Sequence, residues 1–300
     1  MKIQLAMAGL LVWMSGATPA LAQQTMPTEY QQVLTTLAKQ GDYKDNVLKV
    51  NIPRSDIKVA VDGIALPTPL GFGGWVAFTK GDLGVDVMMG DLVLTEAEVN
   101  PVMSAVLDNG LDATALHNHF FADSPRMFYM HVHGHGPIAD LAKRIQPALA
   151  LIGKTAPPAT SAGRAIEGKL DTAALAKIIG APGEQTGDVF KITLGRPDFT
   201  VKEMGAVINA RMGLNTWAAF YGNDGDAVVA GDVAMLASEV TPVLKALRTN
   251  GIDVVAIHHH MTGTQPDVYF LHYWGKGPAQ KLATGVKAAL GQLGKAHGTH

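Results

Sequence analysis

A long segment of this sequence occurs twice, and that internal duplication constrains the fold more than any other feature of the chain. The two copies match first at an offset of 142 residues and, after a single deletion, at an offset of 141. Self-similarity on this scale predicts two structural units that share one architecture. The matching segments include 47–50 with 189–192, 75–78 with 217–220, 98–102 with 239–243, and 109–112 with 250–253.

The duplication also sets the expected domain boundaries. Pro157 and Pro158 stand between the copies among small residues, a composition that breaks regular secondary structure and marks a linker. We expect a leader at 1–22, repeat unit one at 28–152, a linker at 153–165, repeat unit two at 166–293 and a tail at 294–300.

The first residues have the pattern of a secretory signal peptide. Lys2 is followed by an apolar stretch from Leu5 to Trp13, and small residues lead to Ala20-Leu21-Ala22. The apolar stretch is shorter than the ~20 residues that a membrane-spanning helix needs. We therefore expect cleavage after Ala22 and a bacterial protein that is periplasmic or secreted.

Composition excludes several kinds of partner and site. The chain has no cysteine, which rules out disulfides, thiolate metal sites and a lipidated N-terminal cysteine. A formal net charge of −2 provides no basic surface for a phosphate backbone, so no nucleic-acid partner is expected. No segment after the leader is apolar over a length that predicts a transmembrane helix. A hydrophobic content of 47% favours a globular fold that rests on its packed interior.

Within one copy, hydrophobic periodicity and turn residues predict a helix, three strands, a helix, two strands and a last helix. The first helix is expected near 28–40 and near 171–179. The second should begin at Pro101, with Asn100 as its cap, and end at Asn109-Gly110. The last should begin at Pro137 and end or kink at Pro147. This order predicts an α+β fold of two tandem pseudo-symmetric units, each a mainly antiparallel sheet with helices packed on one side.

Histidines are concentrated in two windows, 117–135 and 258–272, which hold nine of the eleven in the chain. In the first window, two strands separated by a turn at Ser124-Pro125 form a predicted hairpin. Pairing His117 with His131 would place alternate residues of both strands on one face. The second window repeats the pattern, with His258 opposite His272. The candidate metal ligands are therefore His117, His119, His131, His133, His258, His260 and His272.

Without thiolate, the strong options for imidazole ligands are zinc, copper, nickel and iron, and we expect zinc or copper. Glu98 and Glu239, together with Asp91 and Asp232, are candidate further ligands, and either glutamate could serve as a general base. The same acids could instead cap backbone N–H groups at turns and helix starts. The histidines could likewise pack and hydrogen-bond, or transfer protons, without any metal.

The two copies differ at one end of the histidine pattern. Repeat unit two has Trp274 and Lys276 where repeat unit one has His133 and His135. Tryptophan is no metal ligand and a nearby ammonium repels cations, so copy one should hold the tighter site. The glycine-rich turn around Lys276 could bind an anion, and Trp274 could wall a pocket for a small ligand.

These residues resemble a known family. The pattern Gly-Asp, Glu-Val-x-Pro-Val, Asn-Gly-x-Asp, His-x-His and His-x-x-Gly-x-Gly-Pro, present twice after an export signal, is similar to the LppY/LpqO family of bacterial envelope proteins. The resemblance covers roughly 28–292 and implies an exported protein, but it implies no chemistry. This chain departs from the lipoprotein members because it has no cysteine to acylate.

The leading hypothesis is a periplasmic metal-binding protein for storage, tolerance or delivery of copper or zinc. A metal-dependent hydrolase with Glu98 or Glu239 as general base is the main alternative. A binding module for an anionic envelope ligand, centred on Lys276, is the third.

Overall fold

The computed structural model describes residues 24–155 and 163–295. The predicted signal peptide, residues 156–162 of the predicted linker and residues 296–300 of the tail lie outside the described residues.

Repeat unit one contains the predicted elements in the predicted order. A short arm, β3, β4 and the 3-10 turn η1, is inserted between the first and second long strands. The elements are α1 (Thr28–Leu37), β1 (Asp42–Lys44), β2 (Val47–Pro53), β3 (Val59–Val61), β4 (Ile64–Leu66), η1 (Thr68–Leu70), β5 (Gly73–Thr79), β6 (Asp86–Thr95), α2 (Glu96–Asp108), β7 (Asp112–His117), β8 (Asp123–Ser124), β9 (Met127–Gly136) and α3 (Ile138–Leu151).

Repeat unit two has the same order, with its own arm formed by β12, β13 and η2. Its elements are α4 (Thr172–Ile179), β10 (Glu184–Thr186), β11 (Val189–Gly195), β12 (Val201–Glu203), β13 (Ala206–Ile208), η2 (Ala210–Met212), β14 (Asn215–Gly222), β15 (Ala227–Leu236), α5 (Ala237–Thr249), β16 (Asp253–His258), β17 (Val268–Gly277) and α6 (Ala279–Leu290).

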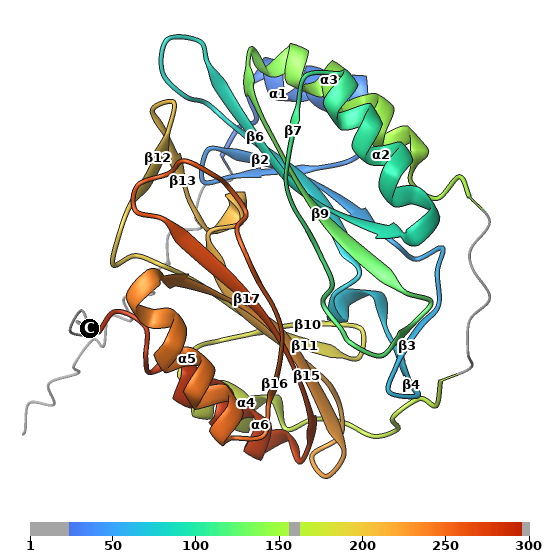
Figure 1. The fold of residues 1–300 in the computed structure, drawn as a ribbon, viewed down its shortest axis with the longest axis vertical. Coiled ribbons are helices and arrows are strands. Elements are labelled where there is room, and N and C mark those ends of the chain that lie inside the picture. The colour runs from blue at the N-terminus through green and yellow to red at the C-terminus, as the bar shows by residue number, and fades with distance from the viewer. Residues whose placement is uncertain (1–23, 156–162, 296–300) are drawn as a thin grey trace, which may run out of the picture.

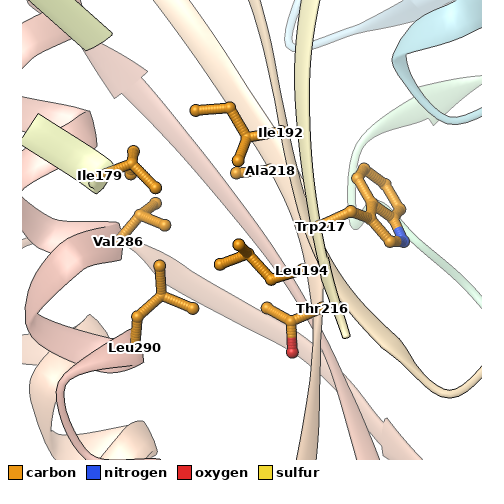
Figure 2. Close-up of a pocket in the computed structure, with 8 residues that line it drawn as sticks. All are labelled: Ile179, Ile192, Leu194, Thr216, Trp217, Ala218, Val286 and Leu290. Atoms are coloured by element: carbon orange, nitrogen blue, oxygen red, sulfur yellow. The ribbon is translucent and has the colours of Figure 1, made fainter. Parts of the chain in front are cut away.

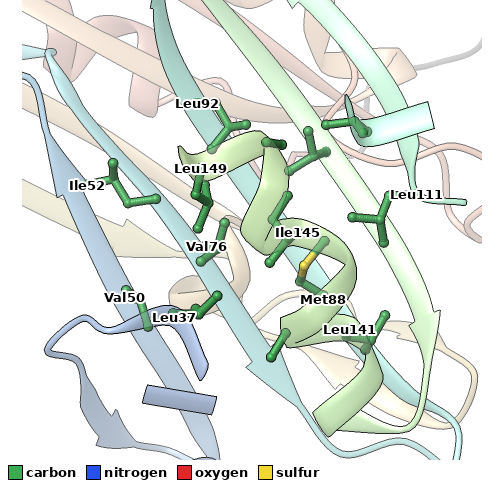
Figure 3. Packing of buried hydrophobic residues seen from close by; sticks show 14 of the residues in the cluster. Leu37, Val50, Ile52, Val76, Met88, Leu92, Leu111, Leu141, Ile145 and Leu149 are labelled. Atoms are coloured by element: carbon green, nitrogen blue, oxygen red, sulfur yellow. The ribbon is translucent and has the colours of Figure 1, made fainter. Parts of the chain in front are cut away.

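Each unit builds its own six-stranded antiparallel sheet. The strand order is β1-β2-β5-β6-β9-β7 in unit one and β10-β11-β14-β15-β17-β16 in unit two, which confirms the α+β class. One face of each sheet packs against the helices of its own unit. In unit one, Leu141, Ile145 and Leu149 of α3 lie against Val76 and Met88 on the strands (Figure 3). In unit two, side chains of α4 and α6 meet β11 and β14, while Trp217 points to the opposite face of the sheet (Figure 2).

The faces that the helices leave free pack against each other, which gives four layers with helices outside and sheets inside (Figure 1). The arms are exchanged between the units. The arm of unit one, including Ile64 and Phe72, shares a buried apolar cluster with Val228 and Trp274 of unit two. The arm of unit two packs in the same way against unit one, where Met212 shares a cluster with strands β2, β5 and β6.

The predicted start of the second helix is wrong, and the last helix runs past the proline at which it was expected to end or kink. Helix α2 begins at Glu96 rather than at Pro101, because Glu98 reaches back and accepts a hydrogen bond from the backbone N–H of Thr95, at 2.8 Å. Pro101 therefore lies inside the helix. Helix α3 does not end at Pro147 but continues to Leu151, with Ala148 and Leu149 still buried.

The exchanged arms predict how the chain responds to cleavage. If a specific protease site is inserted between Thr155 and Gly163 and cut, the two fragments should remain one particle, because two apolar clusters contain residues of both units. Gel filtration and circular dichroism after cleavage measure this. Elution of two separate fragments, or loss of secondary structure, would contradict the arrangement of the arms.

Candidate metal centre

The strands that carry the histidines face each other across the interface between the two sheets. Six histidine side chains meet there, three from each unit, and all but His117 are at most 8% exposed. The sequence predicted one set of ligands in each hairpin, and the structure instead brings both sets into one cluster. We call this group the central cluster, and its members are His117, His119, His131, His258, His260 and His272.

The predicted hairpin register is wrong by two residues. His131 pairs with Ala115 and His117 with Tyr129, and a bulge lies between Ala113 and Ala115. Unit two has the same shift, with His272 opposite Ala256. A shift of two residues leaves each side chain on its predicted face, because the side-chain period of a strand is two. The histidines therefore still share one face of each sheet.

The central cluster is pseudo-symmetric. His117 stacks on its counterpart His258 with ring centroids 3.8 Å apart. The two equivalent cross-unit pairs have similar separations, 3.6 Å for His119 with His272 and 4.0 Å for His131 with His260. A pseudo-two-fold axis therefore passes close to the pair of His117 and His258.

Backbone carbonyls determine which nitrogen of three rings carries the proton. Nδ1 of His272 lies 3.2 Å from the Gly231 oxygen, and Nδ1 of His260 lies 3.1 Å from the Gly213 oxygen. A carbonyl oxygen can only accept, so each Nδ1 donates and the Nε2 of a neutral ring keeps its lone pair. His131 hydrogen-bonds the Gly90 backbone in the equivalent way. The repeated Gly-Asp motif at 90–91 and 231–232 thus orients a histidine of the neighbouring strand.

The central cluster contains many polar atoms that have no hydrogen-bond partner. Within residues 24–155 and 163–295, nine imidazole nitrogens of the six histidines are buried and unpartnered, including Nε2 of His131, His260 and His272. Buried polar groups are normally hydrogen-bonded to protein or to ordered water, so a concentration of this kind without protein partners is unusual. A neutral ring has a single lone pair, so six of these nine nitrogens can bind a cation and the other three are N–H groups.

Burial keeps five histidines of the central cluster neutral. It lowers the pKa of His117 to about 2 and that of His272 to about 4, and neighbouring histidines add to the shift of His117. Burial also lowers the pKa of His119, His131 and His258 well below the ordinary value. Neutral imidazole is the form that donates to a metal, so no proton has to leave these five rings at neutral pH.

Two aspartates accompany the histidines. Asp91 and Asp232 occupy equivalent positions beside His131 and His272 on the neighbouring strands. Oδ2 of Asp232 lies 3.4 Å from Nε2 of His260. Burial raises the pKa of Asp91 to about 7, and the charge of Asp232 adds to the rise. The sequence predicted both aspartates as candidate ligands or caps, and Asp232 is the one that belongs to a possible ligand group.

Three overlapping groups of the central cluster have donor atoms close enough to share a metal ion. In each, the donor atoms lie within 4.8 Å of one another. The groups are His117 with His119 and His272, His117 with His131 and His258, and His258 with His260 and Asp232. His117 and His258 each belong to two groups, so the ligands cannot be divided between the repeats.

The two predicted glutamates are not part of the central cluster. Glu98 binds Arg54 and accepts a hydrogen bond from the Gly153 N–H, and Glu239 binds Arg196 and accepts one from the Gly294 N–H. Burial raises the pKa of Glu98, but the hydrogen bonds from the Thr95 N–H, from Arg54 and from the Gly153 N–H together lower it below its ordinary value. Each glutamate thus links three parts of its unit: the arginine that precedes the arm, the first turn of the helix that carries the glutamate, and the segment after the last helix.

The structure separates His133, Trp274 and Lys276 from the central cluster. His133 contacts Glu203 of the opposite arm. Trp274 is buried against Phe120 and donates from Nε1 to Asp62 at 3.0 Å, and Lys276 is exposed. Trp274 therefore fills an interface between the repeats rather than standing over an open pocket.

Sequence reasoning missed two features near the histidines. The first is Glu203, which was not recognised because a single glutamate in a turn-rich segment has no signal of its own.

The second is a pair of lysine–tryptophan contacts. Lys49 and Lys191 lie over the rings of Trp75 and Trp217, at 4.4 Å and 4.1 Å from the ring centroids. Burial lowers the pKa of both lysines to about 8. Both lysines and both tryptophans recur at the offset of 142 residues, and this repetition could have revealed the two contacts from the sequence.

One protein family matches the chain twice, over residues 31–151 and 173–292, and its description is Domain of Unknown Function (DUF1259). The chain belongs to this family. The two matched segments coincide with the two repeats of the DUF1259 protein described above.

Solved structures similar to this DUF1259 protein include three proteins, each with 12% identity and a TM-score of 0.20. They are a double-ringed trimeric shell protein of the RMM microcompartment, EtuB from Clostridium kluyveri and the trimeric microcompartment shell protein PduB. The matches cover 72%, 84% and 84% of this chain and 86%, 90% and 93% of those chains. No curated protein matches. Among the described residues, no helix has the length and apolar character needed to cross a membrane.

Proposed function

We propose that this protein binds a zinc or copper ion in the central cluster, between its two repeats. The observation that carries the proposal is the set of nine unpartnered imidazole nitrogens, counted over the described part of the chain. Three of them belong to rings whose other nitrogen is already oriented by a backbone carbonyl, as is typical of metal-binding histidines. Zinc and copper both accept imidazole ligands without thiolate.

The burial of the central cluster favours holding a metal over catalysis with it. Catalytic metal sites keep an open position for water or substrate, whereas sites that only hold the ion are closed by protein ligands. Here the possible ligands outnumber the four positions of a tetrahedral ion, and all but one are at most 8% exposed. Glu98 and Glu239 are engaged with arginines, which argues against either as a general base. Storage, tolerance or delivery of the ion is the role that suits a closed site.

We also propose that the protein acts outside the cytoplasm. The support is the pattern of residues 1–22 and the similarity of the repeated motifs to LppY/LpqO envelope proteins. A periplasmic location would expose the protein to metal ions that enter the envelope. Intact mass of the protein from the periplasmic fraction tests this, with Gln23 expected as the first residue.

Metal binding should depend on both repeats at once. We expect His117→Ala and His258→Ala each to weaken Zn²⁺ and Cu²⁺ binding at least about 100-fold, because each ring belongs to two ligand groups. His259→Ala is the matched control, since His259 packs against Tyr269 rather than within the central cluster. Titration calorimetry of metal-free protein measures the affinities. The titrations use a chain that also carries Glu203→Gln, which removes the separate group of His133, His135 and Glu203. If each variant there loses one ion and keeps another at full affinity, the site is not shared.

A further inference from the structure

A second group of metal-binding side chains lies outside the central cluster. Nε2 of His133 lies 2.9 Å from Oε2 of Glu203, and Nε2 of His135 lies 2.8 Å from Oε1 of the same carboxylate. These donor atoms are all within 4.8 Å of one another. The two rings are 4.5 Å apart between centroids, and they stand nearly perpendicular to each other.

The group is assembled by the exchange of the arms. His133 and His135 lie on β9 of unit one, whereas Glu203 lies on β12, in the arm of unit two. At the equivalent place in the other half, β17 carries Trp274 and Lys276 and the arm carries Val61. In that half Trp274 donates a hydrogen bond to Asp62 of the arm. Both halves therefore join the long strand to the opposite arm, but through different side chains. Three ligand-type residues are therefore present together in one half and absent together from the other.

We propose that His133, His135 and Glu203 form a second metal site, distinct from the central cluster, with an open coordination position. Two histidines and one carboxylate are a ligand set of catalytic zinc and non-haem iron sites, in which the remaining positions bind water or substrate. His135 is 28% exposed, against 6% for His133 and 11% for Glu203, so solvent reaches one side of the group. The class of ion is a divalent first-row transition metal.

The distances suit this assignment. Two ligand atoms that each lie about 2 Å from one tetrahedral ion are about 3.3 Å apart. The observed distances between the ring nitrogens and the carboxylate oxygens are 2.9 Å and 2.8 Å, so the carboxylate would have to move only slightly away from the rings to admit an ion. Without an ion, each Nε2 donates a hydrogen bond to the Glu203 carboxylate, which can only accept. To hold an ion, each neutral ring would instead carry its proton on Nδ1 and donate the lone pair of Nε2. The Glu203 carboxylate supplies a negative charge. Two of the three ligand groups in the central cluster have no carboxylate, and the third includes Asp232.

The experiment uses Co²⁺ as a spectroscopic probe in a full-length chain that carries His117→Ala and His258→Ala, which disables the central cluster. We expect one Co²⁺ per chain, with visible absorption bands that change when azide fills the open position. Adding Glu203→Gln or His135→Lys should weaken Co²⁺ binding at least about 100-fold. His135→Lys reproduces the residue of the other half. Asp62→Asn, in the arm of unit one, is the matched control and should leave the bands unchanged.

The outcomes separate this site from the proposed function. In the chain with an intact central cluster, two bound ions, one of which depends on Glu203, support both proposals. A single ion that is lost with Glu203→Gln supports only the second site. Unchanged Co²⁺ bands in both Glu203→Gln and His135→Lys would overturn it, as would bands that do not respond to azide. Circular dichroism confirms that each variant is folded.

Discussion

Metal-free protein should lose stability steeply as the pH falls from about 7 to about 5. Burial lowers the pKa of five histidines of the central cluster, to about 2 for His117 and about 4 for His272. In the unfolded chain these rings titrate near 6.5. Below that pH the unfolded state binds protons that the folded state does not, so the free energy of unfolding decreases as the pH falls. Each such histidine contributes about 1.4 kcal/mol per pH unit.

Asp91 acts in the opposite direction. Its pKa is about 7 in the folded state, against 3.8 as the ordinary value, so between these values the folded state binds one more proton at this group. One aspartate offsets one histidine. The net uptake on unfolding should still be at least two protons near pH 5, or roughly 3 kcal/mol per pH unit.

Urea unfolding of metal-free protein at a series of pH values measures this uptake. His117→Phe combined with His258→Phe removes two of the titrating rings and should make the pH dependence shallower. Val243→Ala is the matched control, because it removes buried apolar volume from α5 and should lower stability equally at every pH. An uptake below one proton in the wild type would show that the central cluster is already protonated or hydrated.

Breaking either buried ion pair should cause a large loss of stability. The side chains of Arg54 and Glu98 are 3% and 1% exposed, with Nη1 and Oε2 2.6 Å apart. Glu98→Gln removes the charge that compensates a buried guanidinium, and such changes cost about 3 to 5 kcal/mol. Glu239→Gln should have a similar effect, because Arg196 and Glu239 form the equivalent pair at 2.8 Å.

The more exposed partner of the same arginine provides the control. Asp56 also binds Arg54, but its side chain is 43% exposed. Asp56→Asn should therefore lower stability by less than about 1 kcal/mol, as is usual for exposed pairs. Thermal and urea unfolding of the two variants give the comparison. Equal effects of Glu98→Gln and Asp56→Asn would mean that burial does not determine the contribution of this pair.

Much of the architecture could be predicted from the sequence because two independent signals agreed. The repeated segments established two units of the same fold, and the alternation of His117 with His119 established a shared face. The start of α2 was missed because Pro101 is a strong local signal. The hydrogen bond from the Thr95 N–H depends instead on the side chain of Glu98, two residues before the expected cap Asn100.

The remainder depends on contacts between distant residues. The hairpin register follows from the bulge at Ala113–Ala115 and from the loop after His117, neither of which has a distinct sequence pattern. The arm around β3 and β4 is a short apolar hairpin, and nothing within it tells which sheet it covers. Hence the predicted set includes all six histidines that the structure brings together, with His133 besides, but the prediction assigned them to two hairpins instead of one cluster. Glu203 could have been found by comparing the copies, since it differs between them together with His133 and His135.

The stacking of His117 on His258 has a consequence for how such a molecule could have arisen. A single-repeat ancestor would have needed to form a homodimer to bury the same face, and this stacked pair would then have been one residue meeting its own copy. In a homodimer every substitution appears twice. Fusion into one polypeptide removes that restriction, so one half can acquire a new group of ligands while the other retains an indole in the same place. Fusion also keeps the halves together at any dilution.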